Sequence, residues 1–147
     1  MRLTMTGGAL ALLLTACGPR VKLPSDALDS AIGAAIGDPT TCVILAKAAG
    51  GKPVYRYGEL FNCDRGLPAC DRPGFLSANQ ALDFAARGRT ASCPSNADAS
   101  RQVGWAEGRV AGRHGAFLYS AVMEGQRALP GEEMSARLDD AFGRAGL

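Results

Sequence analysis

Cysteine thiols are the side chains of this 147-residue chain that are best suited to covalent chemistry. Five are present, and four of them lie in the body of the sequence, at Cys42, Cys63, Cys70 and Cys93. A reactive thiol needs an activating neighbour, but the chain has no Cys-x-x-Cys motif and no histidine near any cysteine. An even set of cysteines in an exported protein is typical of structural disulfides. We therefore expect two disulfides, with a reactive thiol as the alternative.

The spacing of these four cysteines allows three pairings. Cys63 and Cys70 bracket part of a loop that is predicted over residues 61–75 and is long for a compact domain. A bridge between these two residues would staple the loop. We therefore favour a Cys63–Cys70 disulfide, which leaves Cys42 to pair with Cys93.

The fifth cysteine, Cys17, ends a segment with the features of an export signal. Arg2 gives the segment a positive start, and the apolar run over residues 8–14 is too short for a finished transmembrane helix. The motif LTAC at 14–17 resembles the lipobox of bacterial lipoproteins, in which small residues precede the cysteine that receives diacylglycerol. The alternative is an ordinary secretory signal in which Cys17 occurs by chance.

The lipobox resemblance implies that residues 1–16 are a signal peptide and that Cys17 carries acyl chains such as palmitate. It also implies that residues 17–24 are a lipid-anchored tether to an exported domain. Gly18, where an aspartate would favour the inner membrane, implies delivery to the outer membrane on the side that faces the periplasm. The resemblance therefore predicts a place in the bacterial cell envelope and a membrane partner held through the N-terminal lipid.

Serine chemistry is indicated by two short motifs. RTAS at 89–92 and SAN at 77–79 are similar to the Lys-Thr-Gly-Ser and Ser-x-Asn motifs of penicillin-binding and β-lactamase-type serine hydrolases. The similarity implies a binding mouth at which Arg89 holds a carboxylate beside Ser92. These enzymes also need a lysine three residues after the nucleophilic serine as its base, and no serine here has one. The resemblance therefore implies a shared architecture without the activity.

The sequence lacks the motifs of other common catalytic, metal-binding and nucleotide-binding sites. The sequence has no Gly-x-Ser-x-Gly elbow, no His-Glu-x-x-His motif and no P-loop, so we assign no catalytic residue. The single histidine, His114, lies in a predicted turn between glycines and has no ligand pairing with cysteine, so we predict no metal site and no cofactor. A formal net charge of +2 gives no strong positive field, so we predict no nucleic-acid partner.

The elements that position these residues form a single α+β domain over residues 25–147. Helices are predicted from the spacing of apolar residues and from a capping box of Ser77 and Gln80. They cover residues 25–36, 77–88 and a last segment from 130. Strands are predicted from β-branched and alternating segments. They cover residues 41–46, 54–57, 103–110 and 116–123, and residues 61–75 and 89–100 are predicted loops.

The four strands form two hairpins that pair through their central strands. This predicts a four-stranded antiparallel sheet of order 2-1-4-3, with the N- and C-terminal helices on one face and a middle helix elsewhere. The element order resembles the roadblock and profilin-like group, over residues 25–146. That resemblance implies a scaffold, a regulator or a dimer-forming binding module.

Tyr55, Tyr57 and Trp105 are the aromatic residues expected to be partly exposed, with core packing as the alternative for Trp105. Such residues often anchor interfaces, and the loop over residues 61–75 is a further candidate for partner contact. We therefore expect a membrane-anchored, non-enzymatic binding or accessory module for an envelope protein or a cell-wall partner. The alternative is a degenerate penicillin-recognising domain that binds or acts on a peptidoglycan-type ligand, with Arg89 and Ser92 at its site.

Overall fold

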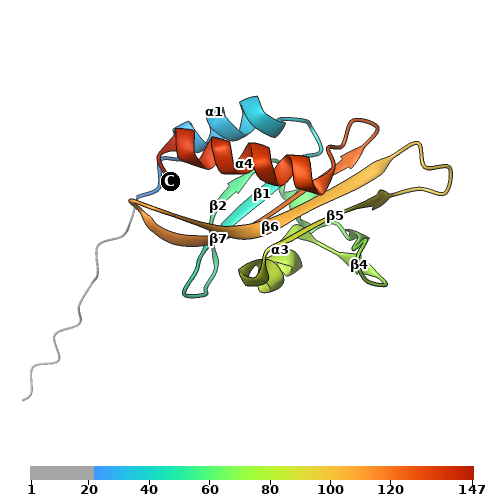
Figure 1. Cartoon of the computed structure of the whole chain (residues 1–147), viewed down its shortest axis with the longest axis horizontal. Coiled ribbons are helices and arrows are strands. Elements are labelled where there is room, and N and C mark those ends of the chain that lie inside the picture. The colour runs from blue at the N-terminus through green and yellow to red at the C-terminus, as the bar shows by residue number, and fades with distance from the viewer. Residues whose placement is uncertain (1–21) are drawn as a thin grey trace, which may run out of the picture.

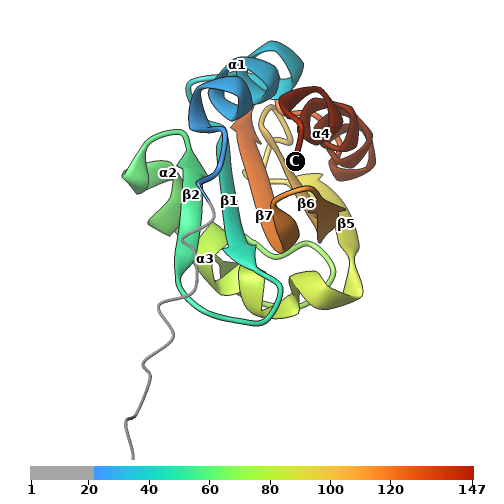
Figure 2. The same ribbon diagram turned by 90° about the vertical axis from the view of Figure 1, so that its left-hand side faces the viewer.

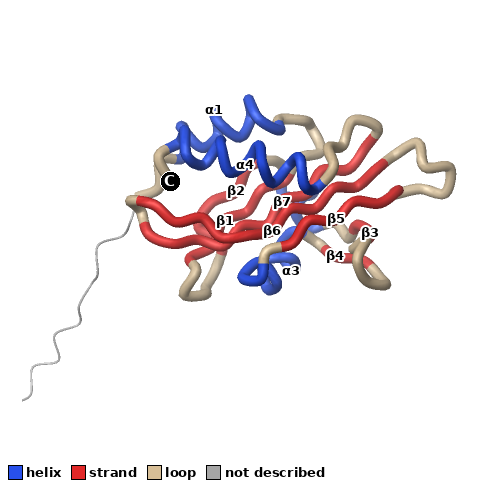
Figure 3. The backbone as a smooth tube through the Cα atoms, viewed as in Figure 1, coloured by secondary structure: helices blue, strands red, loops and turns tan. Residues whose placement is uncertain are grey.

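The computed structural model describes residues 22–147, so the predicted signal peptide and Cys17 lie outside the described residues. The chain forms a central sheet between two helical layers (Figures 1 and 3). The helices are α1 (Ser25–Ile36), α2 (Leu60–Asp64), α3 (Ala78–Ala81), the 3-10 helix η1 (Leu82–Arg87) and α4 (Gly131–Ala145). The strands are β1 (Cys42–Lys47), β2 (Pro53–Tyr57), β3 (Leu67–Pro68), β4 (Phe75–Leu76), β5 (Arg89–Pro94), β6 (Gln102–Gly112) and β7 (Gly115–Gly125).

The main sheet has five antiparallel strands in the order β2-β1-β7-β6-β5. The predicted sheet was wrong in strand number and order, because residues 89–94 form the edge strand β5 rather than part of a loop. β5 pairs with β6 in a regular register from Arg89 opposite Glu107 to Pro94 opposite Gln102. Its side chains alternate between half-buried and exposed, but the half-buried residues are Arg89, Ala91 and Cys93, none of them a large apolar residue, so the hydrophobic period is faint. Pro94 fits because an edge strand can lack a ladder donor.

Both faces of the sheet are covered. α1 and α4 pack on one face, and α2, α3 and η1 lie on the other (Figure 2). β1 is buried on both sides because its side chains alternate between the two layers: Val43 and Leu45 join the core under α1 and α4, whereas Cys42 and Ile44 join the second core. Two separate apolar clusters therefore hold the sheet from above and below.

The second layer contains short elements where a loop and one helix were predicted. Residues 61–75 contain most of α2, the two-residue strand β3 and the start of β4. The predicted helix over 77–88 is one turn of α-helix followed by the 3-10 helix η1. The capping box is formed: Ser77 Oγ accepts from the Gln80 N–H at 3.3 Å, and Gln80 Oε1 accepts from the Ser77 N–H at 2.9 Å.

Two disulfides join this layer to the sheet, and their pairing differs from the favoured one. Cys42 of β1 is bonded to Cys63 of α2, and Cys70 is bonded to Cys93 of β5, with Cα–Cα distances of 5.3 and 5.4 Å. The prediction failed because it treated residues 61–75 as one loop. α2 directs Cys63 toward β1 instead of toward Cys70, and the unpredicted strand β5 places Cys93 above the β3–β4 connection.

The start of α4 approaches the sheet very closely. A Cβ at Gly104 would lie 2.0 Å from the backbone carbonyl oxygen of Leu129, so only glycine fits there. Within residues 22–147, no helix combines the length and the apolar character needed to cross a bilayer.

Peptide mapping without reduction tests the disulfide pairing directly. Cleavage after lysine and arginine, except before proline, should give peptide 23–47 linked to peptide 57–65, and peptide 66–87 linked to peptide 90–101. Mass spectrometry distinguishes these pairs before and after reduction. A linked pair of peptides 57–65 and 66–87 would instead restore the Cys63–Cys70 bridge and contradict the structure.

Candidate functional site

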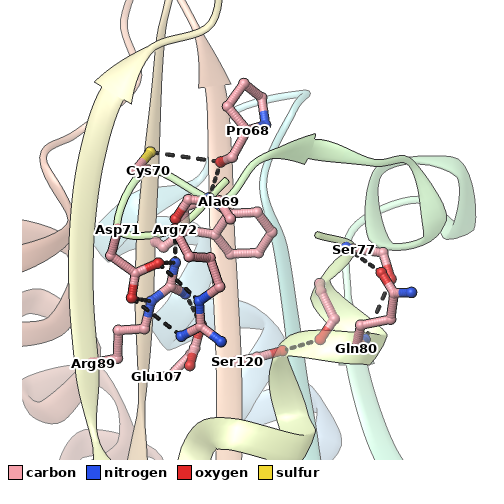
Figure 4. A network of polar contacts seen from close by, with 12 residues as sticks. Pro68, Ala69, Cys70, Asp71, Arg72, Ser77, Gln80, Arg89, Glu107 and Ser120 are labelled. Carbon is pink, nitrogen blue, oxygen red and sulfur yellow. Dashed lines mark hydrogen bonds and ion pairs between the residues drawn. The ribbon is translucent and has the colours of Figure 1, made fainter. Parts of the chain in front are cut away.

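A cluster of charged side chains lies beneath β5 and β6, on the face opposite α1 and α4. We call it the Arg89 cluster; it comprises Arg89, Glu107, Asp71 and Arg72 (Figure 4). The register of β5 and β6 sets Arg89 opposite Glu107. Asp71 and Arg72 follow Cys70 in the β3–β4 connection, and the Cys70–Cys93 disulfide fixes that connection to β5. The cluster is therefore assembled from three separate parts of the chain.

All three guanidinium nitrogens of Arg89 donate hydrogen bonds within the domain. Its Nε donates to Asp71 Oδ2 at 2.7 Å and its Nη2 donates to Asp71 Oδ1 at 2.9 Å, which is a bidentate pair. Nη2 also donates to the carbonyl of Ala69, and Nη1 donates to Glu107 Oε1. The guanidinium carbon lies 5.7 Å from the centre of the Trp105 ring. Arg89 thus links the second layer to the sheet.

The two carboxylates of the Arg89 cluster have opposite surroundings. The Glu107 side chain is fully buried, and its Oε2 has no hydrogen-bond partner among the described residues. Burial raises the pKa of Glu107, although the charge of Arg89 opposes this change. Asp71 is partly exposed, and the hydrogen bonds from Arg89 and then Arg72 hold the pKa of its carboxyl well below the usual range.

A small hollow opens beside the Arg89 cluster. Its volume is about 190 Å³, and Asp71, Arg72, Phe84, Arg87, Gly88 and Arg89 line it. The guanidinium of Arg72 lies over the Phe84 ring, 4.6 Å from its centre. Sites for small molecules and cofactors usually enclose 300–1,000 Å³. The hollow is therefore better suited to a single side chain or a small group than to a cofactor.

A second buried carboxylate on the same face, Glu124 of β7, ties loops together. It accepts hydrogen bonds from Ser95 at 2.7 Å and from Arg101 Nε and Nη2 at 2.8 and 2.7 Å. Arg65, the residue after α2, donates to it at 3.1 Å. These bonds, chiefly those from Arg101, lower the pKa of Glu124 to about 2. All of its acceptor positions face protein donors, so we assign Glu124 a structural role.

The three aromatic residues selected from the sequence do not form one surface. Tyr55 is buried on the α1 side, where its hydroxyl donates to Asp29 Oδ1 at 2.7 Å, and Tyr57 packs against the same core. Trp105 is buried on the opposite face and donates its Nε1–H to the carbonyl of Pro68 at 2.8 Å.

The structure also separates Ser92 from Arg89. The two residues point to opposite faces of β5, since they are three positions apart in a strand. Ser92 Oγ accepts the N–H of Gly131 at 2.8 Å and so satisfies a donor at the start of α4, where Pro130 offers no side-chain cap. The binding mouth implied by the penicillin-recognising motifs is not assembled by this arrangement.

The sequence did not reveal two exposed aromatic residues. Phe61 of α2 is 72% exposed and Phe75 of β4 is 76% exposed. Both lie in residues 60–76, which we call the stapled segment because Cys63 and Cys70 bond it to the sheet. A large apolar residue on each side of a Cys-rich, Gly- and Pro-containing stretch was the available signal, but exposure depends on the folded surroundings.

Searches against protein-family models, curated proteins and solved structures find no match for this chain. Among the described residues, no group of three or more histidine, cysteine, aspartate or glutamate side chains is arranged to hold a metal ion. Function is therefore inferred from the geometry of the chain itself.

Removing the charge of Arg89 should destabilise the fold strongly. In Arg89→Met, Glu107 stays buried without its cation, and breaking a buried pair on one side costs roughly 3–5 kcal/mol. We expect a loss of about 3 kcal/mol in the free energy of unfolding, measured with urea and intact disulfides. The double variant Arg89→Met/Glu107→Leu removes both charges and should recover more than half of that loss. The single variant Glu107→Leu completes the comparison. If the stability losses of Arg89→Met and Glu107→Leu add up to the loss of the double variant, the two charges are not coupled.

Glu124 should make stability depend on pH in the acid range. Its folded pKa of about 2 lies below the usual 4.5. The stabilisation is therefore fully present above pH 4.5 and is lost as the pH falls toward 2; it amounts to roughly 3 kcal/mol. Thermal unfolding across this range should show a shallower pH dependence for Glu124→Gln than for the natural chain. Glu132→Gln controls for the loss of one exposed negative charge, and identical profiles for all three proteins would contradict the assignment.

Proposed function

We propose that this chain is a bacterial envelope lipoprotein, anchored through Cys17 in the outer membrane, whose domain is a non-enzymatic binding module for another envelope protein. The observation that carries the proposal is the stapled segment, which holds exposed aromatic side chains on a backbone fixed by two disulfides. The lipid anchor rests on the lipobox resemblance at 14–17 and on the four paired cysteines, which suit an oxidising compartment.

The stapled segment is rigid for reasons other than regular secondary structure. Its elements are a five-residue helix and two-residue strands. The disulfides fix it at Cys63 and Cys70, and the Trp105 bond to Pro68 and the Arg65 pair with Glu124 add two further points. Binding costs less conformational entropy when the contact residues are already ordered. A cross-linked segment is therefore a favourable platform for recognition.

Phe61 and Phe75 lie on this platform with most of their side-chain surface exposed to solvent. Burying such a side chain would contribute about 1.5–3 kcal/mol, so the isolated domain gains little from leaving both exposed. Aromatic residues on a rigid surface are frequent anchors in protein interfaces. These two residues are thus better candidates for partner contact than Tyr55, Tyr57 and Trp105, whose side chains pack within the domain.

Polar groups of the kinds that serve catalysis are engaged inside the domain. The Ser92 hydroxyl accepts from Gly131, and Ser120 donates to the carbonyl of Ala78 at 2.5 Å. The buried carboxylates Glu107 and Glu124 are paired with arginines. The first and last helices share one face, which is the arrangement implied by the resemblance to the roadblock and profilin-like group, and binding is that group's usual role. These features support a binding module over the hydrolase-like alternative.

The position of α1 supports a protein partner instead of the bilayer. Seven residues separate Cys17 from Ser25, so an anchor at Cys17 would keep the start of α1 within about 28 Å of the lipid headgroups. α1 begins at the end of the molecule that holds the C-terminus, whereas β4 lies toward the other end (Figure 1). With the anchor there, β4, which carries Phe75, would lie toward the end of the molecule farther from the point of attachment.

Crosslinking in intact cells, followed by affinity purification and mass spectrometry, tests the binding surface. The variant Phe61→Ser/Phe75→Ser should lose about 30-fold or more of the captured partner, because two aromatic anchors commonly contribute 2 kcal/mol or more. Its thermal stability should stay close to that of the natural chain, because both side chains are exposed. Val54→Thr, at a residue of β2 that is 42% exposed, is the matched control.

Equal capture by the natural chain and the double phenylalanine variant would contradict the proposed surface. Equal loss in Val54→Thr would show that the effect is not specific to the stapled segment. Fractionation of Cys17→Ser tests the anchor separately: the protein should leave the membrane fraction. A Cys17→Ser protein that remains acylated and membrane-bound would contradict lipidation at this cysteine.

A further inference from the structure

We propose that the hollow lined by Arg72, Phe84, Arg87 and Arg89 receives a carboxylate group of the partner, either an acidic side chain or a chain terminus. This inference rests on the proposed function, because it names the chemistry that the partner brings to one part of the same surface. Asp71 and Arg72 belong to the stapled segment, so this segment forms part of the wall of the hollow.

The hollow contains unused guanidinium donors. Arg89 is occupied by Asp71, Ala69 and Glu107. Arg72 uses only Nε and Nη2, each 3.1 Å from an Asp71 oxygen, and its Nη1 makes no hydrogen bond within residues 22–147. Arg87 makes neither an ion pair nor a side-chain hydrogen bond in the same part of the chain. Arg72 and Arg87 both line the hollow and both keep donors without a hydrogen bond in the described part of the chain. Planar guanidinium groups match the two oxygens of a carboxylate, so these two arginines are its candidate donors.

The charge balance favours a group with a single negative charge. Three arginines line the hollow, and two of their charges are matched by Asp71 and by Glu107 beneath it when both carboxylates are ionised. One positive charge remains, which suits a carboxylate better than a doubly charged phosphate. Glu107 Oε2 is buried without a partner next to Arg89, so the site holds negative charge that would oppose a second ligand charge.

The apolar wall of the hollow indicates what accompanies the carboxylate. Phe84 is 36% exposed, and the Arg72 guanidinium lies over its ring. A carboxylate joined to an apolar or aromatic group can contact both the guanidinium groups and this ring. At about 190 Å³, the hollow accommodates one residue of a partner and not an extended ligand.

Nuclear magnetic resonance of the purified lipidated protein in detergent micelles tests this site with a defined probe. N-acetyl-L-phenylalanine carries a carboxylate and a ring, and N-acetyl-L-phenylalaninamide is its uncharged match. The acid should cause saturable shifts of the Gly88 amide and of the Nε–H signals of Arg72 and Arg87, whereas the amide should not. Arg72→Gln/Arg87→Gln should weaken binding of the acid by at least about tenfold. Arg113→Gln, at an exposed arginine in the β6–β7 turn, should leave it unchanged.

Absence of saturable shifts with the acid, or equal shifts with the amide, would overturn the assignment. Tighter binding of inorganic phosphate than of the acid would assign the hollow to a phosphate group instead and would also overturn it. Crosslinking in cells separates this inference from the proposed function. If Arg72→Gln/Arg87→Gln captures the partner as the natural chain does, the carboxylate contact is wrong and the binding module stands. If the natural chain captures no partner while the acid still binds, the proposed function is wrong and the carboxylate site stands.

Discussion

The two disulfides are the constraint on which the layer formed by α2, α3 and η1 depends. We call this the lower layer, and α1 and α4 form the upper layer. The upper layer is stabilised by packing without a disulfide, because α1 and α4 bury large side chains such as Leu28, Ile32 and Phe142 against the sheet. The lower layer has only short elements, and alanine and cysteine make up much of its core. Disulfides that close loops of this length, with sequence separations of 21 and 23, contribute about 3 kcal/mol each in the chain-entropy model. Covalent cross-links thus replace the packing energy that this layer lacks.

The same cross-links position the groups to which we assign binding. Cys70–Cys93 fixes the β3–β4 connection to β5, and this places Asp71 against Arg89. Arg89 in turn neutralises Glu107 and lies over the Trp105 ring. Phe61 and Phe75 are exposed on a segment that both disulfides bond to the sheet. Under the proposed function, stability and recognition would share one origin, because the disulfides that hold these short elements on the sheet also hold the exposed aromatic residues in place.

Some of this structure could be predicted from the sequence and some could not. α1, β1 and α4 were predictable because their apolar residues repeat clearly and their ends carry stop or start signals. β5 was not, because arginine, threonine and serine hide its alternation. The disulfide pairing failed for the same reason, since it depends on β5 and on α2. Arg89 was selected from a short motif, but its partners Glu107 and Asp71 come from separate elements, and the exposure of Phe61 and Phe75 follows only from the assembled fold.

Amide hydrogen exchange of the Cys70→Ala/Cys93→Ala variant tests most directly whether the cross-links hold the binding surface in place. Mass spectrometry of peptides from the natural chain and the variant would compare exchange in residues 66–76 with exchange in β1, β6 and β7. We expect exchange in residues 66–76 to accelerate by at least about tenfold, because this stretch loses its one covalent link to the sheet, while the three central strands keep their protection. Unchanged exchange in residues 66–76 would contradict the central role of the disulfides.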